Sequence, residues 1–114
     1  MRLRSDIFVS AYIRRCQVEN VPAVLRRRGS AEAGAIFVKV DRLDGTCALF
    51  GPAPQAALDE DAGRRFVRLH DTATIPSAAA EDRLTRELRF DSDLWIVEAE
   101  DRAGLSRLDE VEAP

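Results

Sequence analysis

Apolar and polar positions alternate most regularly over residues 34–54, where two β-forming runs flank the pair Asp44-Gly45. Asp-Gly between such runs indicates a two-residue hairpin turn, because a type I′ turn requires positive φ at both central residues. This turn sets a register in which Val40 faces Leu49 across the hairpin. The pattern therefore predicts an antiparallel hairpin around which the rest of the chain is organised.

The predicted register sorts the hairpin side chains onto two faces, because successive residues of a strand point to opposite sides. The face expected to join the core consists of Ile36, Val38, Val40, Cys47 and Leu49. The other face carries Phe37, Lys39 and Phe50, and two aromatic rings are too many for a fully solvent-exposed surface. We therefore predict that a helix partly covers it or that it is a contact surface. Together with Trp95, these three residues form the candidate interface.

A period near 3.6 residues predicts helices over about Asp6–Glu19 and Ser77–Phe90. The first helix is apolar over more than half of its circumference, so we expect it to be largely buried or to lie between its own sheet and a partner. Ser5 is its predicted N-cap. The second helix has a narrow apolar stripe and Ser77 as its predicted cap, which is typical of an amphipathic surface helix.

Three further apolar runs predict strands at Ala23–Arg28, Arg64–His70 and Leu94–Glu100. The first of them is expected to pair with the hairpin as a meander. The chain is therefore predicted to be a single small α+β domain over residues 1–114, of order α-β-β-β-β-α-β. Its mainly antiparallel sheet is expected to carry both helices on one face. Residues 105–114 are predicted to be a frayed acidic tail.

Composition adds a charge asymmetry to an otherwise ordinary chain of 114 residues, 46% apolar and of net charge −3. Residues 1–42 hold nine Lys and Arg against four Asp and Glu, whereas residues 43–114 hold eight against sixteen. The basic half suggests a candidate anion-binding cluster, which consists of Arg14, Arg15, Arg26 and Arg28. The alternative, which we prefer, is that these arginines pair with the acidic half, for example with Glu98. Nucleic acid is disfavoured as a partner because no RNP, KH or helix-turn-helix signature is present.

The sequence assigns no catalytic residue, metal site or cofactor. His70 is followed by Asp71, but neighbouring strand residues point to opposite faces, so His70 is predicted to be a solvent-facing residue at a strand end. One histidine and two cysteines lack the spacing of a zinc site, and the acidic run 59–61 lacks the order of a calcium loop. The stretch Gly29–Gly34 lacks the Lys that completes a phosphate loop.

Cysteine usage and hydropathy give an expectation about location. Cys16 and Cys47 do not make a disulfide framework and are predicted to be small buried hydrophobes. No signal peptide precedes the first helix, so a reducing cytoplasm is expected. The apolar run Ile7–Ile13 is far too short to span a bilayer, which predicts no membrane association.

Several segments are distinctive: RLRSDIFVSAYIRRC near the start, AEAGAIFVKV and LDGTCALFGPAPQ in the middle, and RELRFDSDLWIVEAEDRAG near the end. Over nearly the whole chain these segments resemble a family of short alphaproteobacterial proteins known as domain of unknown function 1491. The resemblance brings no activity, cofactor or catalytic residue. It implies a stand-alone protein of a bacterial cytoplasm.

Three classes of function follow from these features. The leading hypothesis is a non-enzymatic binding or interaction protein that forms a homo-oligomer such as a homodimer, since the first helix and the hairpin are apolar on more than one side. The second is anion or nucleic-acid binding through the arginine cluster. The third is a small enzyme whose site the sequence does not reveal.

Overall fold

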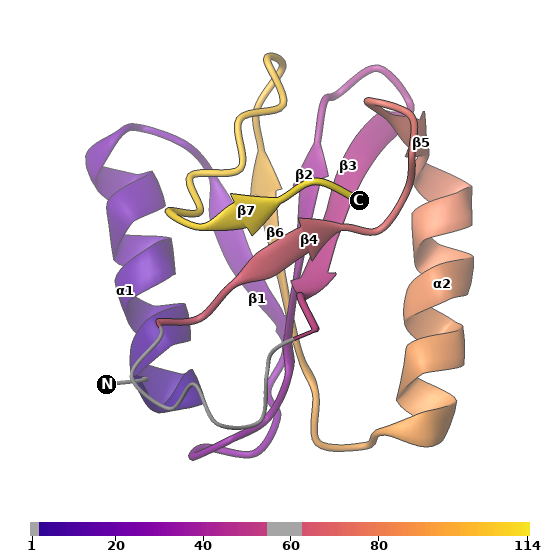
Figure 1. The fold of residues 1–114 in the computed structure, drawn as a ribbon. Coiled ribbons are helices and arrows are strands. Elements are labelled where there is room, and N and C mark those ends of the chain that lie inside the picture. Colours follow the sequence, from indigo (N-terminus) through magenta and orange to yellow (C-terminus); the bar gives the residue numbers. More distant parts are fainter. Residues whose placement is uncertain (1–2, 55–62) are drawn as a thin grey trace.

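The computed structural model describes residues 3–54 and 63–114, and the acidic run 59–61 lies outside them. Over the described residues, two helices flank one seven-stranded sheet (Figure 1). The helices are α1 (Ser5–Val18) and α2 (Ser77–Phe90). The strands are β1 (Ala23–Arg27), β2 (Ile36–Asp41), β3 (Thr46–Pro52), β4 (Phe66–Arg68), β5 (Ile75–Pro76), β6 (Trp95–Glu100) and β7 (Val111–Glu112). The α+β class and the element order are confirmed, with β5 and β7 as additional two-residue strands.

The strand order β1-β6-β2-β3-β4-β7 differs from a meander, because β6 lies between β1 and β2. The β2–β6 and β4–β7 pairs are parallel and the other four pairs are antiparallel, so the sheet is mainly antiparallel as predicted. Trp95, Ile96 and Val97 in β6 are all buried, so this strand needs cover on both faces and a place at the centre. The arginine-containing β1 takes the edge, where charged residues are tolerated.

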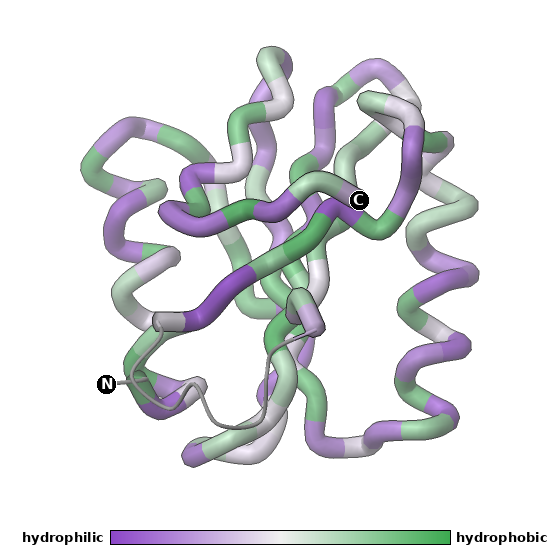
Figure 2. Tube along the Cα trace, in the orientation of Figure 1, coloured by the Kyte–Doolittle hydropathy of each residue, from purple (hydrophilic) through white to green (hydrophobic). Residues whose placement is uncertain are grey.

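The two helices pack on opposite faces of the sheet, so the prediction that both cover one face is wrong (Figure 1). Val38 belongs to the cluster under α1, whereas Phe37 belongs to the cluster under α2. The reason lies in β2, where every residue from Ile36 to Val40 is buried. A strand of this kind places apolar side chains on both faces of the sheet, and a single layer of helices cannot cover two faces. The hydropathy pattern in Figure 2 follows this arrangement, with the most apolar segments in the central strands.

The central hairpin forms at the predicted place, but its register differs by one residue. Asp41 pairs with Cys47, and the Arg42 N–H donates to the Thr46 carbonyl at 3.0 Å, which leaves a three-residue loop. Leu43 and Gly45 take positive φ in this loop, at 63° and 88°. A type I′ turn at Asp44-Gly45 is therefore not formed.

The changed register moves side chains between the two faces. Val40 pairs with Ala48 instead of Leu49, since a slip of one residue turns every side chain of a strand over. Cys47 and Leu49 consequently lie with Phe37 under α2. Phe50 lies on the opposite face, under α1. The predicted division of the hairpin into a core face and a contact face is therefore wrong.

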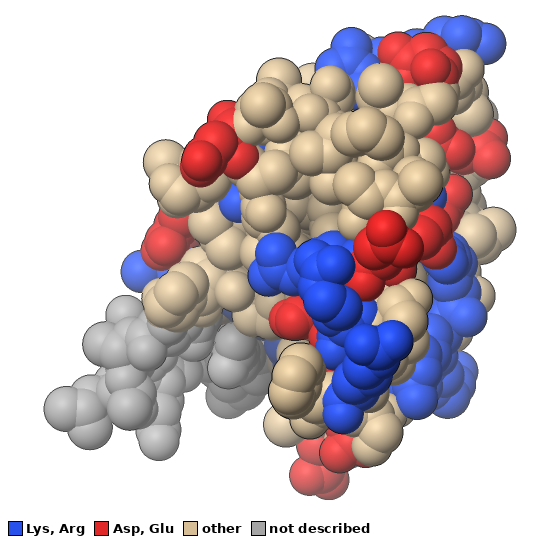
Figure 3. All heavy atoms as spheres, turned by 90° about the vertical axis from the view of Figure 1, so that its right-hand side faces the viewer, with Lys and Arg blue, Asp and Glu red and all other residues tan. Residues whose placement is uncertain are grey.

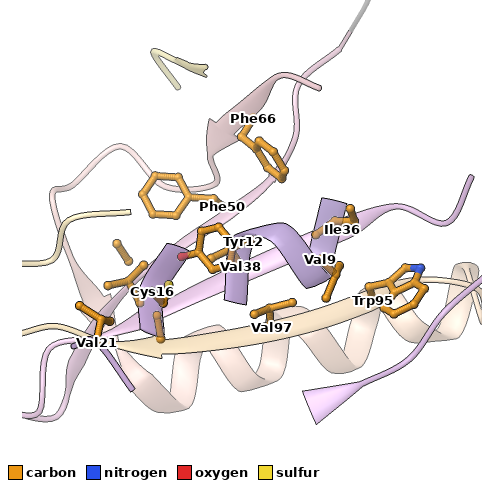
Figure 4. Close-up of a cluster of buried hydrophobic side chains, with 13 residues drawn as sticks. Val9, Tyr12, Cys16, Val21, Ile36, Val38, Phe50, Phe66, Trp95 and Val97 are labelled. Atoms are coloured by element: carbon orange, nitrogen blue, oxygen red, sulfur yellow. The ribbon is translucent and has the colours of Figure 1, made fainter. Parts of the chain in front are cut away.

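The larger core cluster lies between α1 and the sheet, and Figure 4 shows its side chains facing one another. It also reaches the C-terminal segment. Tyr12 donates its hydroxyl proton to the Ser106 carbonyl at 2.7 Å, and Leu108 packs against the cluster. β7 then pairs with β4. Residues 105–114 are therefore held against the body of the domain, in contrast to the predicted frayed tail.

Neither serine predicted as a helix cap acts as one. Arg4 and Pro76 occupy the N-cap positions, and neither makes a side-chain capping bond. Ser5 is instead fully buried and donates to the Gly34 carbonyl at 2.6 Å, which ties the start of α1 to the segment that enters β2. Ser77 faces the sheet, where it accepts a hydrogen bond from Lys39.

Candidate functional site

A closed network of charged side chains lies between α2 and the sheet. Lys39 is only 4% exposed. Its ammonium group donates to Ser77 Oγ at 2.7 Å and to Glu81 Oε2 at 2.8 Å. Arg26 donates to the other Glu81 oxygen at 2.6 Å and to Glu98 Oε1 at 3.0 Å. The pairing of Arg26 with the acidic half of the chain is thus confirmed.

The network is electrically balanced, with two cations facing two carboxylates. The Arg26 hydrogen bond, followed by that of Lys39, lowers the pKa of Glu81 to about 2. Glu81 is therefore fully ionised at neutral pH and joins α2 to both β1 and β2. Because each charge already has a partner within the protein, the network has a structural role and offers no open position to a ligand.

The four arginines of the predicted anion-binding cluster lie in three separate places. Arg14 and Arg28 line the same groove beside α1. Arg15 turns to the other flank of α1, where it donates to Asp109 at 2.7 Å and pairs with Glu19 at 3.4 Å. Arg26 belongs to the network under α2. The structure therefore brings together only two of the four.

The four residues of the predicted interface are buried inside the domain. Phe37 and Lys39 face α2, whereas Phe50 and Trp95 belong to the cluster under α1. None of them is more than 6% exposed. These residues form no exposed contact surface, because the hairpin register differs and each face of the sheet has its own helix. The alternative prediction, that a helix partly covers this face, holds for Phe37 and Lys39, which lie under α2.

His70 completes the backbone pairing of β3. Its Nε2 accepts the Leu49 N–H at 3.0 Å, and its Nδ1 lies 2.7 Å from the Thr72 carbonyl. Because an N–H can only donate, the ring proton must be on Nδ1, which donates to Thr72. Burial lowers the pKa of His70 and keeps the ring neutral. The predicted solvent-facing histidine is therefore a half-buried structural residue.

Mild acidification is expected to destabilise the protein through His70. Because the pKa of His70 in the folded protein lies below the ordinary 6.5, the unfolded chain takes up a proton first as the pH falls. The contribution of neutral His70 to stability is therefore fully present above pH 6.5 and is lost as the pH falls below that value. His70→Gln keeps an acceptor for the Leu49 N–H without titrating. Urea unfolding at about pH 7.5 and about pH 5.5 should show a loss in the native chain and little loss in the variant. As His70 is the only histidine, equal losses would contradict its assignment.

Both thiols are inert by position. Cys16 lies on the buried side of α1 and Cys47 lies under α2, each fully buried and free of a disulfide. Burial raises the pKa of both thiols, so the nucleophilic thiolate is disfavoured. Within residues 3–54 and 63–114, no group of three or more His, Cys, Asp or Glu side chains is arranged to hold a metal ion.

Two exposed features remain on the helices. Figure 3 shows the face that carries α2, where basic side chains gather beside acidic ones. α2 contributes Arg83, Arg86 and Arg89 and ends at Phe90, which is 90% exposed. On the outer side of α1, Ile7 is 49% and Val18 is 74% exposed. The sequence signalled the second feature only as a first helix that is apolar over more than half of its circumference, and it gave no signal for the first.

In the described part of the chain, no helix is both long and apolar enough to cross a bilayer. The fold and its surfaces define a small α+β domain whose buried Lys39 ammonium is paired within the protein. Residues 3–109 match the family model described as protein of unknown function (DUF1491), and the chain belongs to this family. The predicted resemblance is thereby confirmed.

Solved structures of alphaproteobacterial proteins share this fold over almost their entire length. A crystal structure of a DUF1491 family protein from Caulobacter crescentus CB15 is 36% identical, with a TM-score of 0.80 and coverage of 98% of this chain and 99% of that one. A solution structure of an A. tumefaciens protein is 40% identical, with a TM-score of 0.80 and full coverage of both chains. A search of curated proteins finds no match.

Proposed function

We propose that this protein is a small non-enzymatic binding protein that self-associates through the outer face of α1. One observation carries the proposal. Ile7, Ala11 and Val18 follow one another at helical spacing and point away from the sheet, opposite the buried side of the helix. Ile7 and Val18 remain 49% and 74% exposed, so the domain's own core leaves this apolar stripe uncovered.

The stripe suits an antiparallel pair of identical helices. A two-fold axis midway between Ile7 and Val18 would place Ile7 of one copy against Val18 of the other, and the small Ala11 beside this axis would allow the helix axes to approach closely. A single pair of 14-residue helices buries less area than a standard interface. We therefore expect a weak, reversible homodimer. A cytoplasmic location fits this proposal, because Cys16 and Cys47 are both free thiols.

Val18→Glu is expected to convert the dimer into a monomer, since it places a charge at the centre of each apolar contact. Sedimentation equilibrium over a concentration series measures this change. The matched control is Phe90→Glu, because Phe90 is likewise an exposed apolar residue at the last position of a helix. Both variants carry the same added charge and the same unfavourable interaction with a helix C-terminus.

The proposal requires that the native chain and Phe90→Glu associate equally while Val18→Glu does not. A native chain that stays monomeric at millimolar concentration would refute self-association. Loss of the dimer in Phe90→Glu, with Val18→Glu unaffected, would assign the interface to α2 and would also contradict the proposal.

A further inference from the structure

An open groove of about 460 Å³ lies between α1 and the end of β1. Its lining consists of Asp6, Ile7, Ser10, Ala11, Arg14 and Arg28. Arg14 comes from the third turn of α1, whereas Arg28 follows β1, so two arginines that are distant in the sequence meet at one place. The Ser10 hydroxyl lies on the same wall, one helical turn before Arg14.

The two guanidinium groups have no acidic partner in the described residues, in contrast to Arg15, Arg26 and Arg107. Arg28 is held over the Trp95 ring at 5.3 Å from its centroid, and this contact orients the guanidinium without neutralising it. The positive charge of the groove is therefore available to a ligand.

Asp6 is the only carboxylate in the lining, and it is already engaged. Arg4 donates to both of its oxygens at 3.3 Å, and the Ile7 N–H donates to Oδ1 at 2.8 Å. The Arg4 hydrogen bond lowers the pKa of Asp6, so Asp6 stays ionised and forms a neutral pair with Arg4. The net charge that remains in the groove is that of Arg14 and Arg28.

We infer that this groove binds the phosphate group of a small phosphomonoester. Guanidinium groups recognise phosphate oxygens through paired, charge-assisted hydrogen bonds, and the Ser10 hydroxyl supplies a further donor. Ile7 and Ala11 form an apolar wall that suits the carbon skeleton of the ester. A long polyanion is disfavoured, because the groove offers only two guanidinium groups and the carboxylate of Asp6 lies in the same lining.

The groove and the proposed dimer interface share part of the outer face of α1, so phosphate binding and self-association are expected to compete. Ile7 and Ala11 belong to both surfaces, but Arg28 lies outside the α1 stripe and Val18 lies outside the groove. Arg28→Gln therefore tests the groove alone, and Val18→Glu tests the dimer alone. The two variants therefore show which of the two proposals has failed.

The test is an NMR titration of the full chain with phenyl phosphate and with inorganic phosphate at low ionic strength. Backbone amide shifts are expected along one side of α1 and at Arg28, together with a shift of the Trp95 indole N–H. Arg14→Gln and Arg28→Gln should each weaken binding roughly tenfold, as expected for losing a charged hydrogen bond. The matched control is Arg86→Gln, because Arg86 is an exposed helical arginine that forms no ion pair among the described residues.

Tighter binding of phenyl phosphate supports an ester ligand, and equal binding of inorganic phosphate assigns free phosphate as the ligand of the same groove. Equal weakening by Arg86→Gln would reduce the interaction to general surface charge and overturn the site. The absence of localised shifts at millimolar phosphate would also overturn it. Tighter binding of a single-stranded oligonucleotide, with shifts spreading over β1 and α2, would replace the proposal with nucleic-acid binding.

Discussion

Replacing Trp95 by alanine is expected to lower the free energy of unfolding by about 4 kcal/mol, the range for truncating a large buried aromatic residue. Trp95 is 1% exposed and belongs to the cluster under α1. Its indole Nε1–H donates to the Ser30 carbonyl at 2.7 Å, so the side chain also fixes the loop between β1 and β2. Truncation removes the packing and the hydrogen bond together.

Trp95→Phe separates these two contributions. It keeps an aromatic ring in the cluster but removes the shorter of the two hydrogen bonds that the Ser30 carbonyl accepts, the other coming from the Gly34 N–H at 3.2 Å, so we expect a loss of about 2 kcal/mol. Urea unfolding followed by circular dichroism measures both variants, because Trp95 is the only tryptophan and its fluorescence is lost in each. Equal losses for alanine and phenylalanine would show that the ring itself contributes little to stability.

Glu81→Gln is expected to cost about 2 kcal/mol, because it leaves the buried Lys39 ammonium without its nearest carboxylate. Glu98 remains at 3.8 Å from Lys39, a weaker contact than the 2.8 Å pair with Glu81. The Glu81 side chain is 40% exposed, so solvent screening keeps the loss below the range for fully buried ion pairs. Denaturant unfolding at neutral pH measures it.

Lys39→Met provides the matched comparison. It removes the buried charge itself and leaves Glu81 bonded to Arg26, so we expect a loss below about 1 kcal/mol. In the Lys39→Met background, Glu81→Gln should cost less than it does alone, which a double-mutant cycle detects. Additive losses would show that the two residues do not interact.

The same network predicts a dependence on acid. The folded pKa of Glu81 is about 2, below its ordinary 4.5, so its contribution is present above pH 4.5 and is lost as pH falls toward 2. Glu81→Gln should lose this component of the pH profile. This window lies below that of His70, so the two residues can be distinguished in one titration of stability.

The sequence predicted α2 at its observed bounds, Ser77–Phe90, because a repeating apolar stripe and the preceding Pro76 are local signals. It also placed both strands of the hairpin. It failed on the register, because Leu43 takes the positive φ that the Asp-Gly pattern assigns to Asp44. One residue in a turn then decides which side of the sheet each later side chain occupies.

The candidate groove, too, could be predicted only in part from the sequence. Arg14 and Arg28 were both identified from the sequence, but so were Arg15 and Arg26, and nothing local distinguishes the four. Their grouping depends on the orientation of α1 and on the face to which each β1 side chain points. Arg26 lies on the α2 side of the sheet, whereas Arg28 reaches the groove beside α1.

The sequence by itself determined the two helices and the five longer strands, because helical and strand periodicities are set by residues that are near one another in the chain. Only the tertiary structure decided that β6 enters between β1 and β2 and that the helices take opposite faces. Both outcomes follow from the need to bury central strands that are apolar on two sides, which is satisfied only by contacts between distant segments. The uncovered stripe of α1 and the groove at Arg28 are what this arrangement leaves on the surface.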